Sequence, residues 1–324
     1  MSLESQLGMC RNISRREFVS RTAVGVLGAA TVPAITTNIV ADSIEADAKS
    51  TAFSADSKQF TFDTGRLSGV LQQAGSPLGI HPISENASGT PVSRALGVMS
   101  FYRLLASDKR YLPDARGWPN EAALQDDGSV VCKWTADDDH PFDITTTYRW
   151  TESDVLDVVT TVAAKKNLAS FEVFQTCYFN GFDRSWAYAS VDGKSQFVEA
   201  TKDDGHWQMF PRDKGAVELI GDGRWDKPPH PVDWVIRPQL AGPMGMRRDK
   251  ATGLAALMMA PPDDCFAVST PYGEEGHRSL YLSLGGKDIA VGEKATYRSR
   301  LVLRRDVSDE EAIRLYEEYI NPNQ

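Results

Sequence analysis

Two neighbouring stretches of the sequence hold most of the side chains that could bind a sugar or transfer a proton. They are "HWQMFPRD", residues 206–213, and "DGRWDKPPHPVDW", residues 222–234, and together they contain two of the five histidines and three of the seven tryptophans of the chain. Indole rings stack on the apolar C–H faces of pyranose rings, whereas Asp and Arg hydrogen-bond to hydroxyls or to a uronate carboxylate. This composition favours a carbohydrate site.

Within this cluster each residue type suggests a role. Trp225 is expected to form a stacking floor, while Arg224 and Asp222 hold polar groups at the edge of the ring. His206 or His230 is expected to move a proton near neutral pH, because imidazole titrates there. In the alternative reading, the tryptophans of the cluster belong to the core and Asp222 only begins a turn.

The sequence leaves the reaction open between two classes. A glycoside hydrolase needs two carboxylates, about 5–5.5 Å or about 6.5–9.5 Å apart according to stereochemistry, and Asp213 with Asp222 would suit it. A polysaccharide lyase needs a Tyr or His base and an Arg that neutralises a uronate, and Tyr178 or His206 with Arg224 would suit it.

Side chains outside these roles are weaker candidates. Those expected to contact substrate are Arg212, Trp207, Asp183 and His81. His81 precedes a proline in a Gly/Pro-rich stretch, which indicates an extended loop, and Asp183 is expected to form a local ion pair with Arg184. His277 lies beside Glu274 and Glu275, two carboxylates that would favour its charged form. No metal motif is present, although a divalent ion held by His206, His230 and a third histidine stays an alternative.

The elements that must position these residues are mostly strands, because short alternating runs of β-branched and aromatic residues recur along the chain. We expect strands at 59–63, 96–105, 129–135, 142–150, 154–163, 170–179, 206–210, 216–220, 233–237, 253–259, 264–269, 279–284 and 294–304. Asp-Gly pairs and Gly285-Gly286 predict tight turns between them. One helix is expected at 308–320, where Ser308 and Glu311 form a capping box. We therefore predict a single all-β domain over 58–324, preceded by a loose lead-in at 49–57.

Two stretches carry a resemblance to a known family. "LDVVTTVAAKKNLASFEVFQTCYFN", residues 156–180, resembles the aldose epimerase passage that ends in His-x-Tyr-Phe-Asn, and "VGEKATYRSRLVL", residues 291–303, is similar to the final strand of those proteins. The resemblance implies a galactose mutarotase-like fold, which is a large antiparallel β-supersandwich, here with a short C-terminal helix. It also places the end of the strand near Tyr178 beside the family's cleft.

The chain departs from that family at the position of its acid. Mutarotases place a histidine two residues before the tyrosine of this passage, and here Thr176 stands there. A threonine hydroxyl does not titrate near neutral pH and cannot replace imidazole as an acid. The resemblance therefore predicts the fold, and we expect sugar mutarotation to be absent or marginal.

Residues 1–48 are expected to be a twin-arginine signal peptide. Arg15-Arg16 are followed by the apolar, uncharged run "TAVGVLGAATVPAI", residues 22–35, which is too short to cross a bilayer core of about 30 Å as a helix. Ala46-Asp47-Ala48 supplies a cleavage site. We expect the twin-arginine translocase as a transient partner, no membrane anchor after processing, and a periplasmic or secreted protein.

Charge and cysteine content exclude several classes. The chain has a net charge of −9, and because residues 1–48 hold four basic and five acidic side chains, the remainder keeps −8. An acidic surface argues against nucleic acid as a partner. Three cysteines remain, Cys132, Cys177 and Cys265, in apolar runs that favour buried thiols and allow at most one bridge.

Three functions remain open. The first is an exported carbohydrate-active protein that acts on a poly- or oligosaccharide. The second is a non-catalytic carbohydrate-binding protein of the same fold. The third is a cofactor-loaded periplasmic redox protein, which only the export route suggests, and the sequence contains no cofactor fingerprint.

Overall fold

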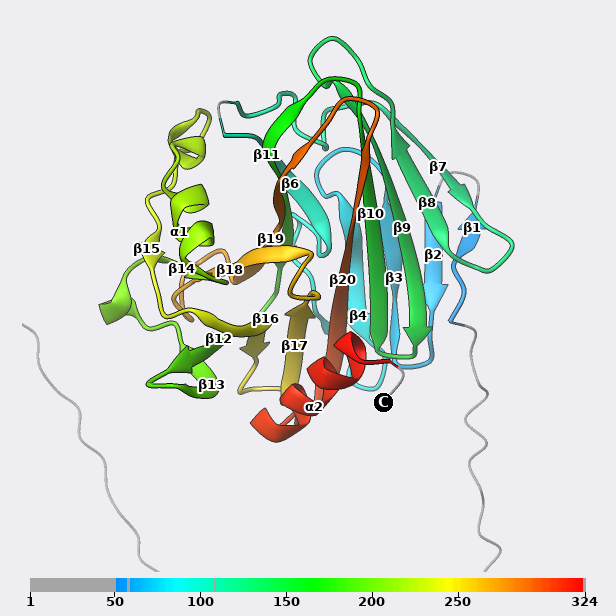
Figure 1. Ribbon diagram of the computed structural model, residues 1–324. Coiled ribbons are helices and arrows are strands. Elements are labelled where there is room, and N and C mark those ends of the chain that lie inside the picture. Colours follow the sequence, from blue (N-terminus) through cyan, green and yellow to red (C-terminus); the bar gives the residue numbers. More distant parts are fainter. Residues whose placement is uncertain (1–50, 57–58, 108, 323–324) are drawn as a thin grey trace, which may run out of the picture. The chain divides into compact units, whose positions relative to one another are not determined.

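Three β-sheets make up most of the protein. The computed structural model describes residues 51–56, 59–107 and 109–322 (Figure 1). The five-stranded sheet has the spatial order β1 (Ser54–Asp56), β2 (Gln59–Asp63), β3 (Leu67–Gln72), β4 (Gly79–Glu85) and β5 (Thr90–Pro91). The nine-stranded sheet has the order β13 (Lys194–Glu199), β12 (Arg184–Val191), β16 (Leu240–Arg248), β17 (Leu254–Met259), β20 (Lys294–Arg305), β10 (Val155–Ala164), β9 (Phe142–Glu152), β8 (Val130–Trp134) and β7 (Asn120–Leu124).

The six-stranded sheet is the one that matters most for function. Its order is β15 (Val235–Ile236), β14 (Trp207–Pro211), β18 (Cys265–Pro271), β19 (Ser279–Ile289), β11 (Leu168–Tyr178) and β6 (Ser100–Leu105). Neighbouring strands pair antiparallel in all three sheets, apart from the short parallel pair of β14 and β15. The predicted fold class, a large antiparallel β-supersandwich with a short C-terminal helix, is confirmed.

One hydrophobic core joins the three sheets, and strand alternation decides which side chains enter it. In β9, Ile144, Tyr148 and Trp150 are buried in this core and are separated by even numbers of residues, as alternation requires. In β11, Val173 and Cys177 also enter it, whereas Phe174 and Tyr178 belong to a second cluster. The six-stranded sheet therefore has one face in the main core and an opposite face of its own.

The C-terminal helix begins where its capping residue predicts. The Ser308 hydroxyl accepts a hydrogen bond of 3.1 Å from the Glu311 backbone N–H, and α2 (Asp309–Ile320) follows. Its buried residues, Ala312 and Tyr316, pack on methionines and aliphatic side chains of β16, β17 and β20. The helix thus covers the outer face of the nine-stranded sheet (Figure 1).

Two predicted local structures are wrong. Residues 216–220 are not a strand, because the Asp213 carboxylate accepts a 2.8 Å hydrogen bond from the Ala216 backbone N–H and caps the helix α1 (Lys214–Ile220). Gly285-Gly286 is not a turn but lies inside β19, where the register with β11 shifts beside Glu172. Both glycines have positive φ, which suits a bulge as well as a turn.

The beginning of the described chain also differs from expectation. Ser54–Asp56 pair with β2, and the neighbouring Phe53 is buried, so these residues belong to the five-stranded sheet and not to a loose lead-in. The predicted signal peptide, residues 1–48, lies outside the described residues.

The three cysteines in the described chain are buried free thiols. Burial raises the pKa of each thiol to about 12, so each stays protonated at neutral pH. No helix in the described part of the chain is long and apolar enough to cross a membrane.

Candidate functional site

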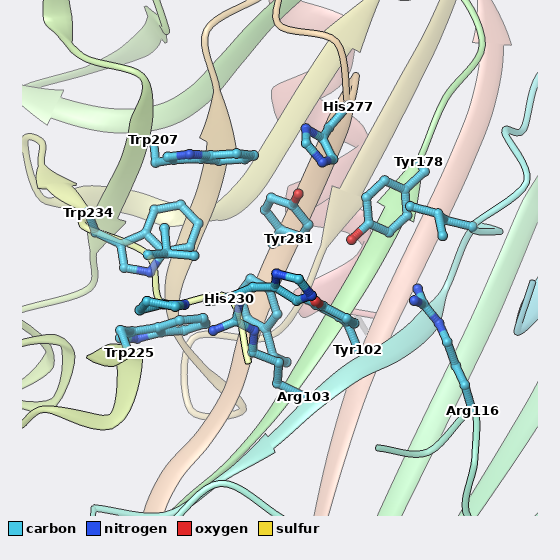
Figure 2. Close-up of a pocket in the computed structure, with 14 residues that line it drawn as sticks. Tyr102, Arg103, Arg116, Tyr178, Trp207, Trp225, His230, Trp234, His277 and Tyr281 are labelled. Atoms are coloured by element: carbon cyan, nitrogen blue, oxygen red, sulfur yellow. Dashed lines mark hydrogen bonds between the residues drawn. The ribbon is translucent and has the colours of Figure 1, made fainter. Parts of the chain in front are cut away.

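A cavity of about 400 Å³ opens on the face of the six-stranded sheet that is turned away from the main core. Figure 2 shows the side chains that surround it. The lining residues are Leu96, Tyr102, Arg103, Arg116, Phe174, Tyr178, Trp207, Trp225, His230, Pro231, Val232, Trp234, His277 and Tyr281. Strands β6, β11, β14 and β19 supply the floor, and the loops at 224–234 and 272–278 supply the walls.

A β-bulge shapes one side of the floor. Phe174 on β11 pairs with Arg103 on β6, but the next residue, Gln175, pairs with Phe101. Tyr102 is therefore an extra residue in β6. In a regular strand consecutive side chains point to opposite faces, whereas the bulge lets both Tyr102 and Arg103 line the cavity.

Aromatic rings form one wall of the cavity. Trp225 and Trp234 lie with their ring centroids 5.2 Å apart and nearly perpendicular, and Trp207 lies 6.0 Å from Trp234. Trp225 is 3% exposed and packs on Phe174, whereas Trp207 and Trp234 are half-buried. The indole N–H groups of Trp225 and Trp234 are buried and make no hydrogen bond with the described residues. They are donors without a partner in the described chain.

A histidine and a carboxylate lie together at the mouth of the cavity. His277 Nδ1 is 3.0 Å and 3.1 Å from the two carboxylate oxygens of Glu275. Burial acts to raise the pKa of Glu275, but the hydrogen bonds and charge of His277 outweigh it and the pKa is lowered. Glu275 therefore stays ionised and holds the imidazole by one nitrogen, which leaves Nε2 for a ligand.

Two tyrosines stand beside this pair. In Figure 2 the Tyr178 hydroxyl points toward the centre of the view, and the Tyr281 hydroxyl points toward His277. Burial raises the pKa of Tyr178, although the charge of Arg116 and a hydrogen bond with it oppose the effect. Burial also raises the pKa of Tyr281 well above its usual value. The Tyr281 hydroxyl accepts a 2.6 Å hydrogen bond from Ser279. Both phenols are therefore neutral near pH 7 and can donate a hydrogen bond to a ligand.

Three arginines surround Tyr102. The guanidinium carbons of Arg103, Arg110 and Arg116 lie 5.1, 5.5 and 5.0 Å from the centre of its ring. Arg103 also lies 5.1 Å from the centre of the Trp225 ring. None of the three forms an ion pair with a carboxylate of the described chain. Arg103 and Arg116 line the cavity, and Arg110 lies behind them.

Two expected substrate-binding residues do not reach the cavity. Arg224 is completely buried, with Nη1 3.0 Å from Glu172 and with three further hydrogen bonds to Asp222. Burial raises the pKa of Glu172, and the Arg224 charge opposes this. Arg224 and Asp222 therefore hold the loop to the sheet, because their polar groups are occupied by each other.

The two aspartates proposed for hydrolysis are not placed as a catalytic pair. Neither Asp213 nor Asp222 lines the cavity, since Asp213 caps α1 and Asp222 holds Arg224. Arg212 is also taken up there: its Nε donates a 2.7 Å hydrogen bond to Asp213, and this bond lowers the pKa of that carboxyl.

Of the three expected histidines, one lines the cavity and two do not. His230 lines the cavity, and its carbonyl accepts a hydrogen bond from Arg103. His206 is exposed outside the lining, with Nε2 3.7 Å from Glu275. His81 lies in β4, where Nδ1 is 2.9 Å from the Ser93 hydroxyl. In the described part of the chain, no group of three His, Cys, Asp or Glu side chains is placed to hold a metal.

Three smaller expectations also need correction or completion. Arg184 pairs with Glu199 and not with Asp183, which lies outside the lining. Thr176, at the family's histidine position, is fully buried between Phe174 and Tyr178, and its hydroxyl lies 2.8 Å from that of Ser100. It has no exposed group with which to contact a sugar.

The stretches "SFYRLL" and "DARGWP" were not predicted to contribute to the site, although they supply Tyr102, Arg103 and Arg116. Of the other new lining residues, Tyr281 lies within a predicted strand, and His277 was only a weak candidate. A basic residue inside a buried strand, with no acidic residue near it, was the available signal.

No protein family model and no curated protein matches this chain. Among solved structures it is similar to a putative aldose 1-epimerase from Escherichia coli K12, at 14% identity over 76% of this chain and 99% of that one, with a TM-score of 0.45. A galactose mutarotase-like protein from Lactobacillus casei matches at 10% identity over 76% and 100%, with a TM-score of 0.46.

A third similar structure is an alpha-N-acetylgalactosaminidase from Bifidobacterium bifidum, at 12% identity over 82% of this chain and a TM-score of 0.50. The match spans only 39% of that enzyme. At such identities the likeness concerns the fold alone. That likeness and the three antiparallel sheets agree with the predicted galactose mutarotase-like β-supersandwich.

Proposed function

We propose that this is an exported carbohydrate-active protein, that the cavity on the six-stranded sheet binds a sugar ring, and that His277 transfers a proton there. The observation that carries the proposal is the presence of a tryptophan wall and a carboxylate-held histidine in one cavity. Similar folds that include an alpha-N-acetylgalactosaminidase agree with a sugar as ligand.

The aromatic wall suits a sugar because pyranose rings have apolar faces and polar edges. Trp207 and Trp234 each keep part of the indole exposed to the cavity, so a ring can stack on them. The Tyr178 hydroxyl points toward the centre of the cavity (Figure 2), where it can hydrogen-bond to a ring hydroxyl.

The proton-transfer group is His277. Glu275 fixes the imidazole through Nδ1, and Nε2 can then take or give a proton at the ligand. None of the described residues that line the cavity is Asp or Glu, so a pair of carboxylates for hydrolysis is absent from this lining. A lyase-type reaction, with His277 as base and Tyr178 as acid, suits these residues better.

A second candidate is a protein that binds sugar without reacting with it. The raised pKa of both Tyr178 and Tyr281 favours this candidate, because a neutral phenol is a poor base near pH 7. If neither tyrosine can act as a base, any reaction in the cavity depends on His277 alone.

The two candidates are separated by one substitution. With a panel of purified polysaccharides, we expect His277→Gln to lower turnover by about 10²–10⁴-fold while binding is retained. Glu275→Gln should lower turnover less and shift its pH profile. The matched control is His206→Gln, an exposed histidine on the same side of Glu275 that does not line the cavity. Binding without turnover in the unmodified protein would support the second candidate and remove the catalytic role of His277.

Export by the twin-arginine route, to the periplasm or the exterior, is a separate part of the proposal and rests on Arg15-Arg16 and the apolar run after them. Changing both arginines to lysine should leave the precursor inside the cell. Normal export of that double variant would contradict it.

A further inference from the structure

We infer that the sugar bound in this cavity carries an oxyanion, either a carboxylate or a sulfate ester, and that Arg103 and Arg116 bind it. The inference deepens the proposed function and rests on it for the sugar, because the two arginines line the same cavity as the tryptophan wall.

The first support is the local charge. Three guanidinium groups lie within 5.5 Å of one tyrosine ring, and none forms an ion pair in the described chain. The cavity lining contains two arginines and two histidines but, in the described chain, no Asp or Glu. An arginine removed from water without an anionic partner is unfavourable, and a bound oxyanion supplies that partner.

The second support is unused hydrogen-bonding capacity. Arg103 is 2% exposed, and its Nε and Nη1 are buried without a partner among the described residues. Nε and Nη2 of Arg116 are buried and unpartnered in the same sense. A guanidinium fork with free N–H groups matches the two or three oxygens of a carboxylate or sulfate.

The third support is electrostatic. Burial and the positive charge of Arg110 lower the pKa of Arg103, because the two cations repel each other. An anion bound at Arg103 offsets the repulsion from Arg110.

A structural role explains only part of this cluster. Arg103 and Arg110 donate hydrogen bonds to the backbone carbonyls of His230 and Pro229, and so hold the loop that covers the cavity. Each needs one nitrogen for this. The Arg116 side chain is held near the Tyr178 hydroxyl, as Figure 2 shows, and makes no such loop anchor. Arg116 is therefore the residue whose substitution tests the inference without removing an anchor.

The test compares charged and uncharged forms of the same saccharide. Binding of oligogalacturonate is measured against its methyl ester, and binding of dextran sulfate against dextran, for the unmodified protein and for Arg116→Gln. We expect the charged member of at least one pair to bind more tightly, and Arg116→Gln to weaken that binding by about 10- to 100-fold. Added salt should weaken it as well.

Two controls make the loss specific. Arg314→Gln removes the same charge from the exposed face of α2, where Arg314 pairs with Glu318, and should leave binding unchanged. Arg116→Lys keeps the charge but loses the planar fork, and should recover only part of the affinity.

The outcomes separate the inference from the proposed function. Preference for oligogalacturonate assigns a carboxylate, and preference for dextran sulfate assigns a sulfate ester. Equal binding of charged and uncharged forms, weakened by Trp207→Ala but not by Arg116→Gln, would overturn the anion and keep the sugar. If no saccharide binds but inorganic sulfate raises the melting temperature in an Arg116-dependent way, the anion site stands and the sugar is overturned. If no saccharide binds and inorganic sulfate has no effect, both the anion and the sugar are overturned.

Discussion

Two groups of arginines on the same face of the six-stranded sheet differ in whether carboxylates lie beside them. Arg224 lies between Glu172 and Asp222, completely buried and bonded to both. Arg103 and Arg116 lie on the other side of β11, next to the Tyr102 ring. Neither has a carboxylate partner in the described chain. The residue type alone favoured Arg224 as a ligand-binding group, and its surroundings show that it holds the loop instead.

The comparison indicates that a buried arginine has a structural role when carboxylates of the same chain are its partners. Such a pair contributes little net stability, but removing one member leaves the other uncompensated. A buried cation without an anionic partner destabilises the empty protein slightly, and an anionic ligand that binds to it removes this destabilisation. The two groups should therefore differ in how much stability their substitution costs.

The largest effect is expected at the compensated group. Arg224→Leu should lower the free energy of unfolding by about 3–5 kcal/mol, because Glu172 is left buried without its cation. Urea denaturation measures this. The double variant Glu172→Leu/Arg224→Leu should lose less than the single one, and equal losses would show that packing and not charge is responsible.

The next largest effect tests the role of Trp225, which lies between Arg224 and the pair of Arg103 and Arg116. It is 3% exposed and packs on Phe174, so Trp225→Ala should cost about 3–5 kcal/mol of stability. Trp207→Ala removes a half-buried ring and should instead weaken sugar binding by about 1–3 kcal/mol. Melting temperature and glycan affinity of the two variants separate these effects. A stable Trp225→Ala variant would contradict the structural role.

Another arginine with a carboxylate partner, Arg305, allows a test by pH. Arg305 makes two hydrogen bonds to Glu85 and, through them and its charge, lowers the pKa of that carboxyl from 4.5 to about 2. Because the folded-state pKa is depressed, the stabilisation is present above pH 4.5 and is lost as pH falls toward 2. We expect about 1–2 kcal/mol after allowing for the hydration of Arg305.

Glu85→Gln tests that assignment by removing the titrating group. Acid unfolding of the variant should be less steep over that range, and an unchanged profile would show that other carboxylates dominate.

The smallest effect is expected at the uncompensated group. Arg116→Gln should change the free energy of unfolding by no more than about 0.5 kcal/mol in the empty protein, because no ion pair is lost. The same measurement on Arg314→Gln gives the baseline for an exposed arginine. A loss as large as that of Arg224→Leu would end the distinction between the two groups.

Most strands were predictable because alternation depends on local sequence, and burial alternates along most of β9 and β20. The helix α1 was missed because one carboxylate, that of Asp213, decides it. The site was only half predictable. Its tryptophans stand out by type, but Tyr102 and Arg103 both line the cavity through a bulge that appears only when β6 pairs with β11.

Strand β20 is the last strand of the described chain, and it lies fifth among the nine strands of its sheet, between β17 and β10. Strands made earlier, such as β9 and β10, can pair as a hairpin, but the two halves of the sheet stay unjoined until β20 is available. Folding should therefore depend on contacts between distant parts of the sequence and should be slow. Until synthesis reaches residue 305, β10 and β17 have open edges, and a chaperone that shields such edges would protect the nascent chain from aggregation.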